Sequence, residues 1–153
     1  ATGGSMADVA FAEGIIGAEN AMGLLSKVDY SVIPRCVYTT PEVASVGLTE
    51  EQARTRDHNV RIGRFPFAAS GRALTMRQSE GMVNVVAEEN GEILRVHIIG
   101  PEATELIAEA ALAMRLEATI EDIANIIHAH PTLSEALKEA ALDACGRPLH
   151  KAK

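Results

Sequence analysis

The sequence predicts an α+β domain, an antiparallel β-sheet of about five strands with helices packed on one face. Two observations favour this class. Short segments with an apolar–polar period of two fill the chain between Arg35 and Gly100, and helical periodicity returns from Pro101 onward. Because a block of strands followed by a block of helices builds segregated layers, the helices should lie together on one side of the sheet.

The first part of the chain predicts a helix and a connector. Apolar residues recur at helical spacing from about Met6 to Met22, and a polar segment that ends at Pro34 follows. We therefore expect residues 1–29 to form a helix with its connector and residues 30–153 to form the α+β domain.

The strands are predicted from short runs rich in β-branched residues. Asn90-Gly91 separates the last two runs and predicts a tight antiparallel hairpin, since both residues tolerate positive φ. Thr49 with Gln52 predicts a capping box that opens a short helix between the second and third strands. The expected strands are 36–40, 43–46, 60–65, 82–86 and 93–99.

Three further helices are expected after the sheet. Pro101 suits the first turn of a helix, where no amide donor is needed, and an apolar stripe follows it. Thr119 and Asp122 have the spacing of a capping box and predict the start of the second helix. The third helix should begin after Pro131.

Composition excludes several classes of protein. The chain has 153 residues, 47% of them hydrophobic, and a net charge of -7, with 3% aromatic residues and no basic run. These values fit a globular domain and disfavour a disordered chain, a membrane protein or a nucleic-acid-binding protein. Without a signal peptide pattern, we expect a cytoplasmic protein. Cys36 and Cys145 have no disulfide or metal-ligand spacing.

One polar cluster stands out, on the predicted turn between the last two helices. Pro131 excludes helical backbone at His130, so the imidazole is held off the preceding helix. Thr132 and Glu135 have capping-box spacing, and Glu135 could do no more than bond to the Thr132 amide. Alternatively, Glu135 could accept the proton of one ring nitrogen of His130 and so fix its tautomer, the arrangement of general acid–base catalysis.

Other candidate sites are weaker. His128 and His130 form an H-x-H pair, but no third ligand stands at a suitable spacing, so we expect no metal and interpret His128 as a partly buried residue at a helix end. No glycine motif for dinucleotide or phosphate binding occurs. The aromatic residues of the loop 65–74 fit either the core or a subunit contact, where aromatics are enriched.

Several segments together strongly resemble one family, the carboxy-terminal interface domain of dihydrolipoamide dehydrogenase, among the FAD-dependent pyridine nucleotide-disulfide oxidoreductases. The resemblance runs from about Met6 to Leu142. The motifs that carry it are His128-Ala129-His130-Pro131-Thr132-Leu133-Ser134-Glu135-Ala136, Tyr38-Thr39-Thr40-Pro41-Glu42-Val43, Phe65-Pro66-Phe67 through Gly71-Arg72-Ala73, and Val96-His97-Ile98-Ile99-Gly100-Pro101.

The resemblance implies a homodimeric flavoprotein that oxidises dihydrolipoamide to lipoamide with NAD, through FAD and a redox-active disulfide. It implies that His130 is the general base for a dihydrolipoamide thiol and that Glu135 orients it. It also implies that His130 and Pro131 lie against the flavin of the partner subunit. A lipoyl domain of a 2-oxoacid dehydrogenase complex would be a further partner.

The same resemblance implies that the chain is a fragment. The FAD domain, the NAD domain and the redox disulfide of the family lie upstream, and residues 1–29 would be a remnant of the FAD domain. We therefore expect no bound FAD or NAD and no activity from the chain alone, and Cys36 and Cys145 do not inherit the redox role. The alternatives are a stand-alone α+β dimerisation or binding module, or the interface domain of another disulfide reductase, such as glutathione or mercuric reductase.

Overall fold

The computed structural model describes residues 6–48, 52 and 60–150, and the chain divides into two compact units, Ala1–Ile33 and Pro34–Lys153. The smaller unit carries helix α1 (Ala7–Ala21), close to the expected range. Side chains hold its connector to the helix, since the Tyr30 hydroxyl donates to Glu13 at 2.7 Å. The assignment of residues 1–29 to an FAD domain stays a prediction.

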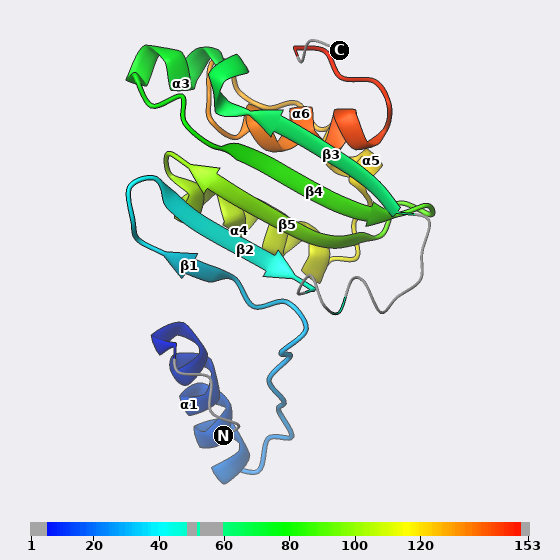
Figure 1. Cartoon of the computed structure of the whole chain (residues 1–153). Helices are drawn as coiled ribbons and strands as arrows, with labels where there is room; N and C mark the ends of the chain where they lie inside the picture. Colours follow the sequence, from blue (N-terminus) through cyan, green and yellow to red (C-terminus); the bar gives the residue numbers. More distant parts are fainter. Residues whose placement is uncertain (1–5, 49–51, 53–59, 151–153) are drawn as a thin grey trace. The chain divides into compact units, whose positions relative to one another are not determined.

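The larger unit is built on a five-stranded antiparallel sheet, as predicted, with the strand order β1-β2-β5-β4-β3 (Figure 1). Alternation of apolar and polar residues puts one side of each strand into the core. Val85, Val96 and Val46 are aligned across neighbouring strands and are all buried. The strands are β1 (Arg35–Val37), β2 (Glu42–Gly47), β3 (Val60–Pro66), β4 (Met82–Glu88) and β5 (Ile93–Gly100).

The hairpin between β4 and β5 forms where it was predicted. Gly91 takes a φ of 96°, in the region that favours glycine, and its amide donates to the Glu88 carbonyl at 3.0 Å. The Asn90 side chain accepts from the Glu92 amide at 2.9 Å. The turn chemistry of two adjacent residues therefore fixes the register of the two strands.

The helices lie together on one face of the sheet (Figure 1), as expected. Helix α4 (Ala103–Arg115) covers β2 and β5, and helix α6 (Glu135–Ala144) covers β3 and β4, with α5 (Ile120–Asn125) packed on α6. The Thr119–Asp122 capping box that opens α5 is confirmed.

Helix α6 approaches the sheet very closely at Gly63 of β3. A Cβ added to Gly63 would overlap the carbonyl of Ala140 on the helix. Along α6, a run of alanines and leucines from Ala136 to Ala144 is buried against the strands. The small residues on both sides thus fix the position of α6, the helix that begins with Glu135.

The structure decides between the two interpretations of the loop 65–74. Phe65 and Phe67 are 2% and 0% exposed, so these aromatics belong to the core. The segment is not simply a loop, because it contains a 3-10 turn (Phe67–Ala69) and helix α3 (Gly71–Met76). Ser70 accepts a hydrogen bond from the Ala73 amide and caps α3.

One expectation about a helix start is corrected by the structure, and a second one is not tested. Pro101 is not in the first turn of α4, which begins at Ala103, because Glu102 takes left-handed backbone with a φ of 53° at the cap position. The predicted capping box of Thr49 lies outside the described residues.

Candidate functional site

The sharp corner between α5 and α6 brings His130 and Glu135 together. The Nδ1 atom of His130 lies 2.9 Å from Oε1 of Glu135. Helix α5 ends at Asn125, and the His130–Pro131 bond is cis. The chain therefore leaves α5 before the imidazole and enters α6 at the carboxylate that contacts it.

Glu135 makes both of the contacts between which the sequence did not decide. While Oε1 meets His130, Oε2 accepts the Thr132 amide proton at 2.8 Å. The capping-box spacing of Thr132 and Glu135 does not produce a cap by Thr132, since Ser134 precedes the helix and Glu135 is its first residue. The cause is that the Thr132 hydroxyl bonds to the Ala129 carbonyl instead, at 2.7 Å.

The environment of Glu135 favours its ionised form. Partial burial raises the pKa of Glu135, but the Thr132 amide, His130 and the charge of His150 together outweigh burial, so the pKa lies below the ordinary value. A carboxylate can only accept hydrogen bonds. Nδ1 of His130 therefore carries the proton of the neutral ring, and Nε2 is left as its proton acceptor.

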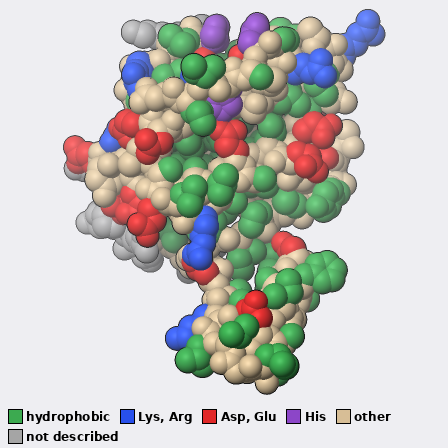
Figure 2. Space-filling model, turned by 180° about the vertical axis from the view of Figure 1, so that it is seen from behind, with side chains coloured by type: hydrophobic (Ala, Val, Ile, Leu, Met, Phe, Trp, Pro, Cys, Tyr) green, Lys and Arg blue, Asp and Glu red, His purple; other side chains and the backbone are tan. Residues whose placement is uncertain are grey.

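His130 is presented outward. Its side chain is 79% exposed, whereas the Glu135 side chain is 28% exposed. Within the part of the chain that the structure describes, Nε2 of His130 has no hydrogen-bond partner. Figure 2 shows histidine side chains on the surface of the larger unit close to carboxylates. The corner can thus take a proton from a group that lies outside this chain.

His128 is also paired with a glutamate, but it faces inward. Its side chain is 7% exposed, Nε2 lies 2.7 Å from Oε1 of Glu109, and Nδ1 lies 3.3 Å from the Ile126 carbonyl. Both ring nitrogens thus face acceptor oxygens within the domain. Sequence reasoning anticipated the burial of His128, but it was wrong to place His128 at a helix end, because α5 ends at Asn125. It also missed Glu109, which lies 19 positions away on α4.

A third histidine–glutamate pair holds the end of the described chain. Glu139 on α6 is buried, and its carboxylate accepts the backbone amides of Leu149 and His150 at 3.3 and 3.1 Å. Nδ1 of His150 lies 2.8 Å from the same carboxylate. Sequence reasoning assigned no role to His150, and no local pattern indicated Glu139.

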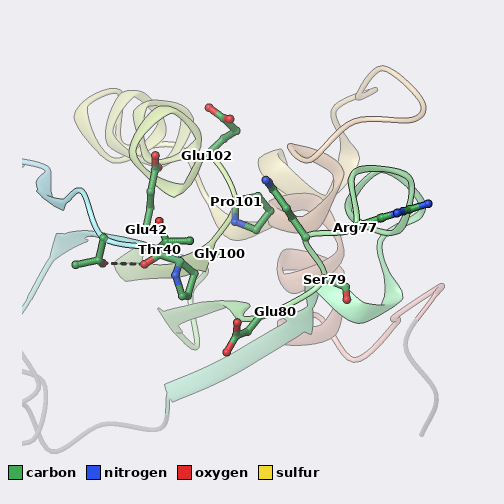
Figure 3. A pocket seen from close by; sticks show the side chains of 11 residues that line it. Thr40, Glu42, Arg77, Ser79, Glu80, Gly100, Pro101 and Glu102 are labelled. Atoms are coloured by element: carbon green, nitrogen blue, oxygen red, sulfur yellow. Dashed lines mark hydrogen bonds between the residues drawn. The ribbon is translucent and has the colours of Figure 1, made fainter.

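A cavity of about 420 Å³ lies apart from these pairs, between the segments 39–42, 77–80 and 100–102 (Figure 3). Glu42 is tied to helix α4, because its carboxylate accepts the amide and the hydroxyl of Thr104 at 3.0 and 2.8 Å. Figure 3 shows the guanidinium of Arg77 pointing away from Glu42. None of the predicted site residues lines this cavity.

The described residues form neither a metal site nor a disulfide. Among the described residues, no group of three or more His, Cys, Asp and Glu side chains could hold a metal ion. No disulfide joins Cys36 and Cys145, which both lie in described segments. In the same segments no helix has the length and apolar character that crossing a membrane requires.

This chain is similar in sequence to dihydrolipoyl dehydrogenases from different organisms. The chain is 50% identical over 147 residues to a dihydrolipoyl dehydrogenase of Bacillus subtilis, covering 95% of this chain and 31% of that protein. It is 48% identical over 149 residues to a mitochondrial dihydrolipoyl dehydrogenase of Pisum sativum, covering 97% of this chain and 30% of that protein. The chain thus spans about a third of the length of these relatives.

A solved structure and a family model agree with these relatives. The crystal structure of LpdA from Mycobacterium tuberculosis superposes with a TM-score of 0.81 at 26% identity, over 90% of this chain and 30% of that one. The family model described as the pyridine nucleotide-disulphide oxidoreductase dimerisation domain matches residues 33–141. By that match, which covers most of its length, this chain belongs to the family of pyridine nucleotide-disulphide oxidoreductase dimerisation domains.

Proposed function

We propose that this chain is the interface domain of a dihydrolipoyl dehydrogenase and that it supplies His130 and Glu135 to the active site of a partner subunit. The observation that carries the proposal is the outward-facing imidazole, 79% exposed, whose inner nitrogen is held by a carboxylate. His150 is also exposed and paired with a glutamate, so the motif His128–Ala136, which resembles dihydrolipoamide dehydrogenase, is what selects His130. The similarity to dihydrolipoyl dehydrogenases supports the choice of reaction.

The chemistry that the pair can perform is proton transfer. A dihydrolipoamide thiol is mostly protonated near neutral pH, and only its thiolate attacks a disulfide. Nε2 of His130 accepts the thiol proton, which leaves a thiolate and an imidazolium. Glu135, ionised and 2.9 Å from Nδ1, stabilises that imidazolium. A positioned acid–base group of this kind contributes about 10²–10⁴-fold to the rate.

The cofactors of the proposed enzyme are FAD and NAD, and the electrons would pass through FAD and a redox disulfide supplied by the rest of the protein. Within this chain, His130 and Pro131 are both exposed at the corner and would lie against the flavin of the partner subunit. A corner that is exposed among the described residues of its own domain fits such a group. The chain alone should therefore bind no flavin and have no activity.

The partners follow from the same proposal. A second subunit completes each active site, so the intact enzyme is a homodimer, and a lipoyl domain of a 2-oxoacid dehydrogenase complex delivers the substrate. We place this enzyme in the cytoplasm, although some of its relatives are mitochondrial.

Subunit mixing tests the proposal in the intact polypeptide. One subunit carries His130→Gln and the other lacks one cysteine of the redox disulfide, with separate affinity tags for each. If His130 serves the partner, the mixed dimer has one site with both defects and one intact site, and it regains about half of the wild-type dihydrolipoamide oxidation. If His130 serves its own subunit, each site keeps one defect and the mixed dimer stays inactive.

A further inference from the structure

Thr132 lies between the two members of the acid–base pair and bonds toward both of them. Its hydroxyl oxygen lies 2.7 Å from the Ala129 carbonyl, which belongs to the peptide group that joins Ala129 to His130. Its backbone amide donates to Oε2 of Glu135 at 2.8 Å. Thr132 therefore connects the backbone beside the imidazole to the carboxylate that holds the imidazole.

The direction of these hydrogen bonds follows from the number of protons. The Thr132 hydroxyl has one proton, and the Ala129 carbonyl can only accept it. At 2.9 Å the Ser134 hydroxyl must therefore be the donor toward the Thr132 oxygen. The result is a short chain of hydrogen bonds from Ser134 through Thr132 to Ala129, in which each bond polarises the next.

His130 depends on this arrangement because little else holds it. Its side chain is 79% exposed, and Glu135 is its one hydrogen-bond partner among the described residues. An exposed imidazole that loses a fixed partner becomes free to adopt several rotamers. The orientation of His130 is thus set by the distance between the Ala129–His130 peptide and the Glu135 carboxylate, and Thr132 spans that distance.

We propose that Thr132 is a positioning residue for the His130–Glu135 pair: its hydroxyl, bonded to Ala129, holds the corner in the shape that keeps Nδ1 of His130 protonated and Nε2 open to a thiol. The role in thiol deprotonation rests on the proposed function, but the effect on the imidazole is a property of this chain alone. Thr132→Val removes the hydroxyl and keeps the shape of the side chain. Thr132→Ser keeps the hydroxyl and removes the methyl group.

Nitrogen NMR of the imidazole rings tests the proposal in this chain without any cofactor. In the wild type, the neutral His130 ring should carry its proton on Nδ1. In Thr132→Val, the share of rings protonated on Nε2 should rise, and Thr132→Ser should restore the wild-type ratio. Thr75→Val is the matched control, since Thr75 is exposed and its hydroxyl donates to the Arg72 carbonyl at 2.8 Å in α3.

A wild-type tautomer ratio in Thr132→Val would overturn the proposal, even if the melting temperature fell, because the hydroxyl would then serve stability only. If Thr132→Val does not fold, Thr132→Ala provides the same test with a smaller side chain. A changed ratio in the Thr75→Val control would also overturn it, since the effect would not be specific to the corner.

Kinetics in the intact flavoprotein separate this proposal from the proposed function. There Thr132→Val should lower kcat for dihydrolipoamide about three- to tenfold with KM unchanged, the range expected from one neutral hydrogen bond. A changed tautomer with unchanged kcat would keep Thr132 as a positioning residue and would refute the role of His130 as the base. An unchanged tautomer with lowered kcat would refute the positioning role alone.

Discussion

Two histidines that lie two positions apart are each paired with a glutamate, yet their surroundings are opposite. The His128 side chain is 7% exposed and its partner Glu109 comes from helix α4. The His130 side chain is 79% exposed and its partner Glu135 follows five positions later. The contact distances are nearly the same, 2.7 and 2.9 Å, so the distance does not separate the two pairs.

What separates them is the number of ring nitrogens that remain accessible. Both nitrogens of His128 face oxygen atoms of the domain, so this imidazole links the α5–α6 corner to α4. His130 has one nitrogen held and one open. The buried imidazole of His128 is thus fully used within the domain, whereas the open nitrogen of His130 is the one that we propose to serve chemistry.

The largest expected effect comes from breaking the exposed pair of His130 and Glu135. In the intact flavoprotein, His130→Gln should lower kcat for dihydrolipoamide about 10²–10⁴-fold, because the thiol loses its proton acceptor. The melting temperature, flavin content and dimer mass should stay those of the wild type, since the exposed His130 side chain contributes little to packing within its own domain. A loss of folding or of the dimer with unchanged kcat per folded site would show that the two pairs have the same structural role.

The next effect concerns the buried pair. Glu109→Ala leaves the His128 imidazole buried without its partner, and the free energy of unfolding of this chain should fall by about 1–3 kcal/mol in urea titrations. A double-mutant cycle with His128→Ala isolates the coupling. The same cycle at His130 and Glu135 should give a coupling of about 1 kcal/mol or less, as exposed ion pairs do. Equal couplings would contradict the distinction.

Local signals in the sequence predicted most of the fold. The strands, the Asn90-Gly91 hairpin and the Thr119–Asp122 capping box were found because residues adjacent in sequence determine them. The start of α4 was missed, since the left-handed backbone of Glu102 belongs to a residue type that rarely adopts it. Helix α3 was missed because its six residues are too few for a periodic pattern.

The distinction between local and long-range contacts also explains which contacts of the site could be predicted. His130 and Glu135 are close in sequence, and Pro131 between them restricts the backbone, so their pairing was a testable prediction. Glu109 and Glu139 are brought to His128 and His150 by the folding of segments outside the helices against α4 and α6, over separations of 19 and 11 positions. No local pattern encodes such pairs, and the structure was needed to find them.

The smallest expected effect is a pH dependence of stability that Glu135 contributes. Partial burial raises the pKa of Glu135, yet the Thr132 amide and His130 outweigh it and hold the folded-state pKa below the ordinary value of 4.5. A group with a depressed folded-state pKa stabilises the fold fully above its unfolded-state pKa, and this stability is lost as pH falls through the folded-state pKa. The free energy of unfolding should therefore decrease below about pH 4.5.

Glu135→Gln isolates this contribution. The variant has no carboxylate at the corner, so its unfolding free energy should fall less steeply than that of the wild type as pH decreases below about 4.5. Asp122 serves as the reference, because its pKa is also lowered, by the hydrogen bonds from Thr119, and Asp122→Asn should flatten the decrease below the ordinary Asp value of 3.8 without touching His130. Only Glu135→Gln should also change the tautomer ratio of His130. If both variants changed it equally, the carboxylate of Glu135 would not be what orients the imidazole.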